Sequence, residues 1–287
     1  MSDKMRKLLG RIPLHVVVIT IALIWMLPSM GVLLNSFRPP QAIRSSGWWN
    51  IFAHPFNITT WTLENYETVL EAQGLAHAFR NSLFISVPAT VIPILVAAFA
   101  AYAFAWMDFP GRRLLFSLVV GLLVVPLQMT FVPVYSIYTS LGLNGTFLGI
   151  WLAHTGYGLP FAVYLLRNFF GSLPSELFES AYLDGASFFT AFTRLALPLS
   201  VPSLAALAIF QFLWVWNDLL VALIYLGGTP RVAPLTVRVA NLVNSLGAQA
   251  YLLPAAAVVS MALPLVVFFS LQRFFVRGIL AGSIKGG

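Results

Sequence analysis

The sequence is poor in charge. Only 9% of its 287 residues are Asp, Glu, Lys or Arg, whereas 59% are hydrophobic. Soluble domains carry about 25% charged residues, so this chain cannot cover a water-facing surface, and we expect an integral membrane protein. The chain also has no cysteine, which excludes a disulfide framework, thiol catalysis and a cysteine-based metal site.

Motifs for chemistry are missing as well. No G-x-x-x-x-G-K-[ST] phosphate loop occurs, so the chain lacks this site for ATP. The histidines (His15, His54, His77 and His154) form no i, i+4 pair, so we expect no metal. Nothing places Ser, His and Asp as a triad, so we expect no enzyme and no cofactor in this chain. The net charge of +7 follows the positive-inside bias of membrane proteins, and no nucleic-acid partner is expected.

Apolar stretches dominate what is present. Crossing a bilayer takes about 20 mostly apolar residues, and six stretches qualify: roughly 12–34, 77–106, 114–138, 147–170, 201–226 and 250–272. Pro126 and Pro133 interrupt the third stretch, which predicts a kink there. The sequence therefore predicts an all-α fold, with one transmembrane domain of six helices over residues 1–287.

The distribution of Lys and Arg orients these spans. Most of the 16 basic residues fall on the side that carries both termini. The opposite side receives Arg38, Arg44, Arg80, Arg231 and Arg238. Because cytoplasmic loops carry the excess of basic residues, we expect both termini in the cytoplasm and a multi-pass protein in the cytoplasmic (inner) membrane.

A polar, charge-bearing segment at 173–200 separates the fourth and fifth spans on the cytoplasmic side. Four apolar residues would form one stripe of a first short helix, at i, i+1, i+4 and i+5: Leu177, Phe178, Ala181 and Tyr182. Glu179 and Asp184 lie off this stripe. The pattern predicts an amphipathic helix along the membrane surface.

A second short helix is predicted to follow. Gly185 suits a helix stop, Ser187 can cap the next helix, and Pro198 would end it. On pattern alone, an ordinary amphipathic segment at the lipid headgroups explains these features as well as a docking surface does.

The spacing within this segment is specific. It reads Glu179-Ser180-Ala181, three residues, Gly185, nine residues, then Leu195-Ala196-Leu197-Pro198. This resembles the E-A-A-x₃-G-x₉-I-x-L-P signature of permease subunits in binding-protein-dependent ABC importers. Ser180 replaces an alanine and Leu195 an isoleucine. The stretches 216–226 and 272–286 are similar to the maltose-type carbohydrate branch, in particular its second permease subunit.

The resemblance implies a type I ABC importer permease fold with a cytoplasmic coupling helix over about 175–186. The residues it assigns to ATPase coupling are Leu177, Phe178, Glu179, Ala181, Tyr182, Asp184 and Gly185. It also implies four partners besides the lipid bilayer: a homologous second permease, a cytoplasmic ATPase dimer that binds ATP and Mg²⁺, an extracytoplasmic sugar-binding protein, and a sugar. We expect an α-glucoside or a similar glucose-containing sugar. A stand-alone secondary carrier or channel is the alternative.

The fifth predicted span contains the sequence W-V-W-N-D at 214–218. Asp218 is the only acid inside a predicted span, and such a residue is a functional candidate by default; structural pairing is the favoured interpretation. Trp214, Trp216 and Asn217 could contact a sugar, although tryptophan is also common at membrane interfaces. These four residues form a possible substrate pathway. The outer loop 227–249 is either a plain connector or, by the resemblance, a contact for the binding protein.

Overall fold

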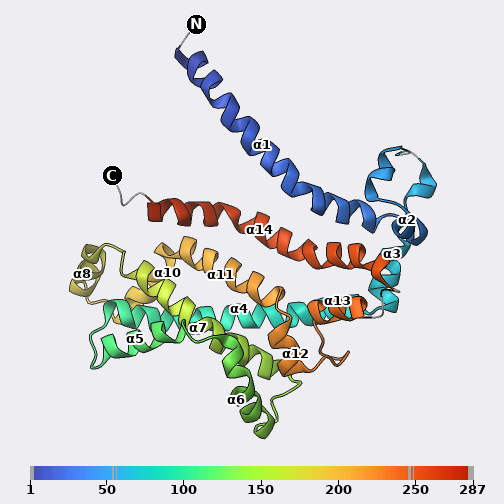
Figure 1. The fold of residues 1–287 in the computed structure, drawn as a ribbon. Coiled ribbons are helices and arrows are strands. Elements are labelled where there is room, and N and C mark those ends of the chain that lie inside the picture. Colours follow the sequence, from blue (N-terminus) through green and yellow to red (C-terminus); the bar gives the residue numbers. More distant parts are fainter. Residues whose placement is uncertain (1–2, 54, 56, 245–246, 248, 284–287) are drawn as a thin grey trace. The chain divides into compact units, whose positions relative to one another are not determined.

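The structure is a computed structural model that describes residues 3–53, 55, 57–244, 247 and 249–283 (Figure 1). These residues form helices and turns, and no strand occurs among them. The chain divides into two compact units, Met1–Leu75 with Val239–Met261 and Ala76–Arg238 with Ala262–Gly287. Residues 245, 246 and 248 of the outer loop, and 284–287 of the tail, lie outside the described residues.

The all-α prediction is confirmed for the described part of the chain. Its α-helices are α1 (Asp3–Ser36), α2 (Pro40–Ser45), α3 (Glu64–Glu67), α4 (Leu75–Trp106), α5 (Arg112–Leu122), α6 (Leu127–Ser140), α7 (Phe147–Phe170), α8 (Ser175–Leu183), α9 (Phe188–Ala191), α10 (Leu197–Leu199), α11 (Val201–Trp216), α12 (Leu220–Leu226), α13 (Leu235–Asn244) and α14 (Leu253–Ser283). Short 3₁₀ segments are η1 (Trp48–Ala53), η2 (Ile58–Thr60) and η5 (Ala250–Leu252), and π-helical segments are η3 (Thr68–Ala72) and η4 (Phe192–Ala196).

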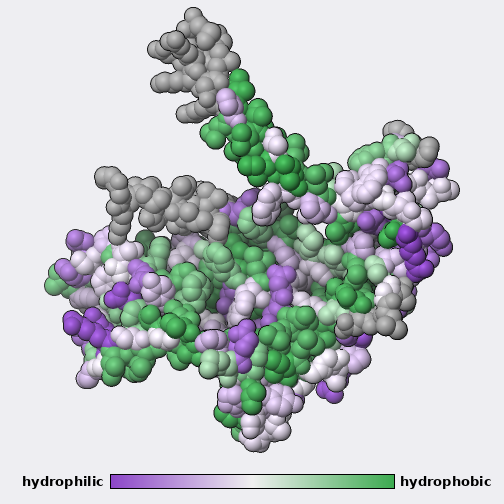
Figure 2. Space-filling model, in the orientation of Figure 1, coloured by the Kyte–Doolittle hydropathy of each residue, from purple (hydrophilic) through white to green (hydrophobic). Residues whose placement is uncertain are grey.

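In the described part of the chain, three helical stretches are long and apolar enough to cross a membrane: Ile12–Ser36, Leu75–Trp106 and Ala250–Gln272. Two bent pairs, α5 with α6 and α9–α10 with α11, raise the number among the described residues to five if each pair is one span. Figure 2 shows hydrophobic side chains along α1. Only 6% of its most apolar 18-residue stretch is buried within the chain. Such a surface requires lipid or protein to cover it.

The predicted six-span count is only partly supported. Helix α7 matches the fourth predicted span in position but is not among the apolar candidates. Its middle carries His154, Thr155, Gly156 and Tyr157, which lower the mean hydropathy of every 18-residue stretch of the helix. The predicted kink in the third span lies at Pro126, where α5 and α6 meet at 101°, whereas Pro133 stays inside α6.

The fifth predicted span, 201–226, is not one helix. Helix α11 ends at Trp216 and α12 begins at Leu220, with Asn217–Leu219 between them. Helix α4, in contrast, continues for 32 residues although it contains Pro88 and Pro93. The third predicted span therefore breaks at Pro126, α4 continues through Pro88 and Pro93, and the break in the fifth predicted span contains no proline.

Two hydrophobic clusters form the core of the second unit. One surrounds Tyr225 and joins α4, α6, α7 and α12; the other surrounds Phe170 and Phe178 and joins α4, α7, α8 and α9. In lipid, close packing and interhelical hydrogen bonds drive helix association. The hydrophobic effect contributes little there, because lipid tails are as apolar as the helix surfaces. These two clusters fix the positions of the candidate sites.

In the first unit, Arg38 follows α1 and is almost fully buried, with 2% of its surface exposed. Its guanidinium donates hydrogen bonds to Asn35 Oδ1 (2.9 Å) and to the carbonyls of Ala42 (2.9 Å) and Ser46 (3.1 Å). These carbonyls lie at the C-terminal part of α2, where the helix dipole favours a cation. Burial lowers the pKa of Arg38 from its ordinary value, yet a guanidinium stays protonated in proteins.

Candidate functional site

The segment 173–200 forms two short helices, as predicted. The first is α8, and Gly185 follows it with φ +83°, a left-handed conformation that favours glycine. Ser187 caps the second helix, because its Oγ accepts a hydrogen bond from the Thr190 amide at 3.1 Å. That helix runs through α9, η4 and α10 to Leu199, one residue beyond Pro198.

The apolar stripe of α8 faces this chain's own helices more than was expected. Phe178 is fully buried and stacks on Trp106 with ring centroids 4.0 Å apart. The hydroxyl of Tyr182 lies 3.0 Å from that of Tyr102. The side chain of Phe178 therefore packs against α4 within this chain.

The opposite side of α8 is open. Leu177 is 44% exposed and Leu183 is 89% exposed. Glu179 and Asp184 are also exposed, while Ala181 is half-buried. Leu183 was not in the predicted set, although its exposure makes it the most accessible apolar residue of α8; a helical wheel drawn beyond Tyr182 could have found it. The helix thus presents an exposed face that carries both apolar and acidic side chains.

The residues at 214–218 separate into different environments. Trp216 is 2% exposed and lies between Phe79 and Phe212, with ring centroids 5.4 and 5.5 Å away. It is a core residue. Asn217 is exposed, and its side-chain amide donates to the carbonyl of Leu213 at 2.8 Å.

Asp218 has a structural setting. Its carboxylate accepts hydrogen bonds from the amides of Val221 (3.3 Å) and Ala222 (3.0 Å), so it caps α12. Its carbonyl accepts a hydrogen bond from Thr236 Oγ1 at 2.6 Å. His154 Nε2 lies 3.9 Å from the carboxylate. These contacts satisfy the acid locally and account for the break between α11 and α12.

Trp214 lines a cavity between α7 and α11. This cavity of about 260 Å³ is lined by Tyr157, Gly158, Phe161, Phe210, Gln211 and Trp214. Trp214 is 38% exposed and meets the ring of His154 edge-on at 5.3 Å. Aromatic faces beside an amide suit a polyol or sugar. Tyr157 and Gln211 were not among the predicted site residues, although a polar side chain within an apolar run of the sequence was a usable signal.

Tyr157 also lines a second cavity of about 300 Å³, between α5, α6 and α7. Its hydroxyl lies 2.9 Å from Thr130 Oγ1 and 2.7 Å from the hydroxyl of Tyr225. This short chain of hydroxyls joins α6, α7 and α12. Each of these hydroxyls can donate or accept a hydrogen bond between the helices of the second unit.

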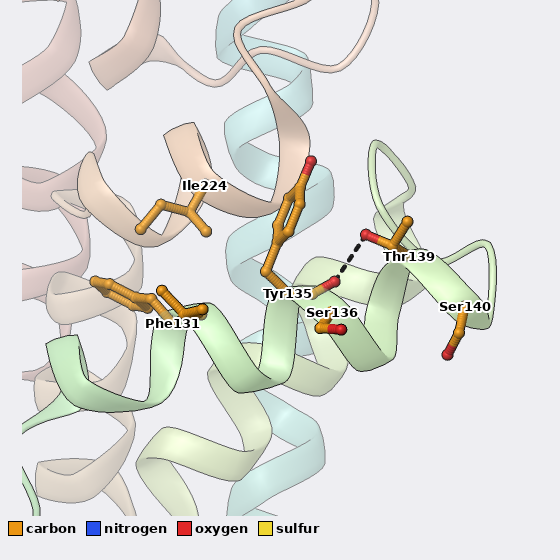
Figure 3. A pocket seen from close by; sticks show the side chains of 7 residues that line it. Phe131, Tyr135, Ser136, Thr139, Ser140 and Ile224 are labelled. Atoms are coloured by element: carbon orange, nitrogen blue, oxygen red, sulfur yellow. Dashed lines mark hydrogen bonds between the residues drawn. The ribbon is translucent and has the colours of Figure 1, made fainter.

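A wider, more open pocket of about 640 Å³ lies where α6 meets α12 (Figure 3). It is lined by Phe131, Val132, Tyr135, Ser136, Thr139, Ser140 and Ile224. Thr139 donates its hydroxyl hydrogen to the carbonyl of Tyr135 at 2.8 Å. The lining is mainly apolar, so the pocket offers few polar groups for recognition. Among the described residues, no group of three His, Cys, Asp or Glu could hold a metal.

Comparison with known proteins decides the family. Residues 81–281 match the family described as "Binding-protein-dependent transport system inner membrane component". The chain belongs to this family. It is therefore a membrane-embedded transport component of the inner membrane and not an enzyme.

Individual relatives agree with this family. The permease is 61% identical to the osmoprotective compounds uptake permease protein GgtD of Synechocystis sp., over 96% of this chain and 92% of that protein. It is 55% identical to the alpha-glucoside transport system permease protein AglG of Rhizobium meliloti, over 81% of this chain but only 63% of that protein.

A solved structure supports the fold. A chain of a bacterial ABC transporter involved in the import of the acidic polysaccharide alginate superposes with a TM-score of 0.78. The match covers 96% of the permease and 99% of that chain, at 20% identity. The predicted type I ABC permease fold is thereby confirmed.

Proposed function

We propose that this chain is one of two permease subunits of an ATP-driven sugar importer, and that it forms half of the translocation pathway. An extracytoplasmic binding protein delivers the sugar, and a cytoplasmic ATPase dimer supplies the energy from ATP and Mg²⁺ bound outside this chain. The observation that carries the proposal is the family match over residues 81–281, together with an exposed helix that bears the E-A-A-type spacing.

The names of the relatives narrow the substrate. The 55% identical relative is an alpha-glucoside permease, and the trehalose permease protein SugB of Mycobacterium tuberculosis is 34% identical over 91% of this chain. Both names specify glucose-containing sugars. The 61% identical relative is named for osmoprotective compounds, and small sugars and their glycosides serve in that role. We therefore assign an α-glucoside or a similar glucose-containing compound to this permease.

Helix α8 is the coupling helix of this proposal. Its exposed residues Leu177, Glu179 and Asp184 would meet the ATPase, while Phe178 fixes the helix to α4. Ala181 and Tyr182 lie at the border of the two faces. Gly185 allows the sharp change of direction after α8, since its φ of +83° would strain any side chain.

Six crossings follow if α7 is counted with the three apolar helices and the two bent pairs. An even number of crossings keeps both termini on one side, and the Lys and Arg distribution assigns that side to the cytoplasm. The cavity beside Trp214 would then lie within the membrane part, with Gln211 and Tyr157 as further groups able to bond sugar hydroxyls. We include Trp214 in the pathway and exclude Trp216, which is buried in the core.

The experiment is retention of the ATPase on the purified transporter. Glu179→Arg and Gly185→Val should each release the ATPase, measured as the ratio of subunits after affinity purification. Gly142→Val is the matched control, because Gly142 also has a positive φ (+66°) with open space around it but lies in the predicted outer turn. Full ATPase retention in both α8 variants would refute the coupling role.

A further inference from the structure

At its outer end, helix α4 is hydrogen-bonded to the segment between α12 and α13. Asn81, 7% exposed, donates through Nδ2 to the carbonyls of Arg231 and Ala233, both at 3.1 Å. Ser82, 2% exposed, accepts a hydrogen bond from the Leu235 amide at 2.8 Å. Three hydrogen bonds to backbone groups therefore fix this segment to α4 irrespective of its own side chains.

The other end of α4 is fastened to α8. Trp106 stacks on Phe178 and donates through Nε1 to the carbonyl of Phe170 at 3.1 Å. Tyr102 contacts Tyr182 through their hydroxyls, 3.0 Å apart. Figure 1 shows α8 at this end of α4, away from α12. We call the set Tyr102, Trp106, Phe170, Phe178 and Tyr182 the aromatic joint.

Between these ends, the first proline of α4 does not weaken the helix. Pro88 has no amide hydrogen, so it leaves the carbonyl of Phe84, four residues earlier, without its helical partner. Trp151 of α7 donates its Nε1 hydrogen to this carbonyl at 2.9 Å. A neighbouring helix thus replaces the missing bond, as membrane helices require.

The second proline is compensated in the same way. Pro93 leaves the carbonyl of Ala89 without a helical partner. Gln211 of α11 donates through Nε2 to that carbonyl at 3.2 Å. Gly158 of α7 provides the space, since a Cβ there would lie 2.6 Å from Gln211 Nε2. Helix α4 therefore stays a single helix of 32 residues, about 48 Å long at 1.5 Å per residue.

We propose that α4 is the mechanical link that joins the outer segment 231–235 to α8. This rests on the proposed function, in which the outer loop meets the binding protein and α8 meets the ATPase. Displacement of the outer segment moves the N-terminal end of α4 through Asn81 and Ser82. The continuous helix carries that displacement to the aromatic joint, and hence to α8. Coupling of this kind needs a contiguous set of packed and hydrogen-bonded groups, and the contacts above supply one.

The test uses the complete transporter in lipid nanodiscs and measures how far sugar-loaded binding protein stimulates ATP hydrolysis. Ser82→Ala removes one outer contact, and Tyr182→Phe removes the hydroxyl contact of the aromatic joint. Each should lower the stimulation by about fivefold, which corresponds to the loss of a hydrogen bond worth about 1 kcal/mol. Thr90→Val is the matched control, because the Thr90 hydroxyl donates to a carbonyl of its own helix, that of Ser86 (2.7 Å).

Because the two contacts act in series, the double variant should lose little more than the worse single variant. Multiplied losses in the double variant, or unchanged stimulation in both single variants, would overturn the link. The ratio of ATPase to permease separates this inference from the proposed function. A wild-type complex that lacks the ATPase, or shows no stimulation, contradicts the proposed function itself.

A distance measurement covers the case in which the variants fail to assemble. The chain has no cysteine, so Leu95→Cys on α4 and Ser175→Cys on α8, both exposed, can carry spin labels without other changes. If the aromatic joint transmits displacement, the distance between the labels stays the same with and without ATP in the assembled transporter. A distance that changes between these states overturns the proposal.

Discussion

Substitution of Gly158 by alanine tests most sharply whether Gln211 stabilises α4 by donating to the carbonyl of Ala89. The added Cβ would lie 2.6 Å from Gln211 Nε2 and 2.7 Å from Oε1, closer than non-bonded atoms approach. The Gln211 amide must then move, and the carbonyl of Ala89 loses its donor. An unsatisfied buried group costs about 1–3 kcal/mol. Alanine also favours the helix by about 1 kcal/mol, so we expect a net destabilisation of about 1 kcal/mol, which lowers the Tm of a chain of this size by about 2–4 °C.

The assay heats the purified protein in mild detergent and measures thermal unfolding as the loss of the monodisperse peak. Gly156→Ala is the matched control on the same helix, because a Cβ at Gly156 meets nothing within 4 Å and alanine favours a helix by about 1 kcal/mol. Gly156→Ala should therefore keep or raise the Tm. Equal Tm values for the two variants would refute the account of Gln211 and Ala89.

Three further predictions concern stability. Arg38→Met removes the donor that Arg38 supplies to Asn35 Oδ1 and to the Ser46 carbonyl, whereas the Ala42 carbonyl keeps the Ser46 amide; it should cost about 1–3 kcal/mol, seen as a lower Tm, and an unchanged Tm would contradict a structural role of the guanidinium. Asp218→Ala removes the cap of α12 and should cost about 1 kcal/mol, whereas Asp218→Asn keeps an acceptor and should cost less; equal losses would contradict the capping role. Phe178→Ala should cost about 3–5 kcal/mol and speed proteolysis within 173–200; unchanged cleavage would show that α8 is anchored by other contacts.

Local chemistry was readable from the sequence. The Ser187 cap, the stop at Gly185 and the kink at Pro126 each depend on one residue and its immediate neighbours. Such features follow from backbone conformation and hydrogen bonding within a few residues. The E-A-A-type spacing was equally local, and the family match agrees with it.

The direction in which a side chain faces was harder to predict. The apolar stripe of α8 correctly placed Phe178 on a buried face, but periodicity cannot say whether this chain or a partner covers it. Trp214 and Trp216 illustrate the same limit, since one lines a cavity and the other lies in the core. Residues two apart on a helix point in different directions, and only the tertiary neighbours decide the role of each.

The sequence does not reveal which side chains bond the two carbonyls that the α4 prolines leave without a helical partner. Trp151 and Gln211 lie 67 and 122 residues from the carbonyls that they satisfy, and no local pattern links them. The same holds for Asn81, whose partners are 150 and 152 residues away. These long-range contacts define the path from the outer segment to α8, and only the tertiary structure shows them.

The central claim is that this permease moves sugar only when a separate ATPase drives it. Uptake of a labelled α-glucoside into proteoliposomes tests this directly, with the complete transporter and with this chain alone. We predict that uptake requires the ATPase, ATP and sugar-loaded binding protein, and is lost in the Glu179→Arg variant. Uptake by this chain alone, driven by an ion gradient without ATP, would contradict the claim and identify a secondary carrier.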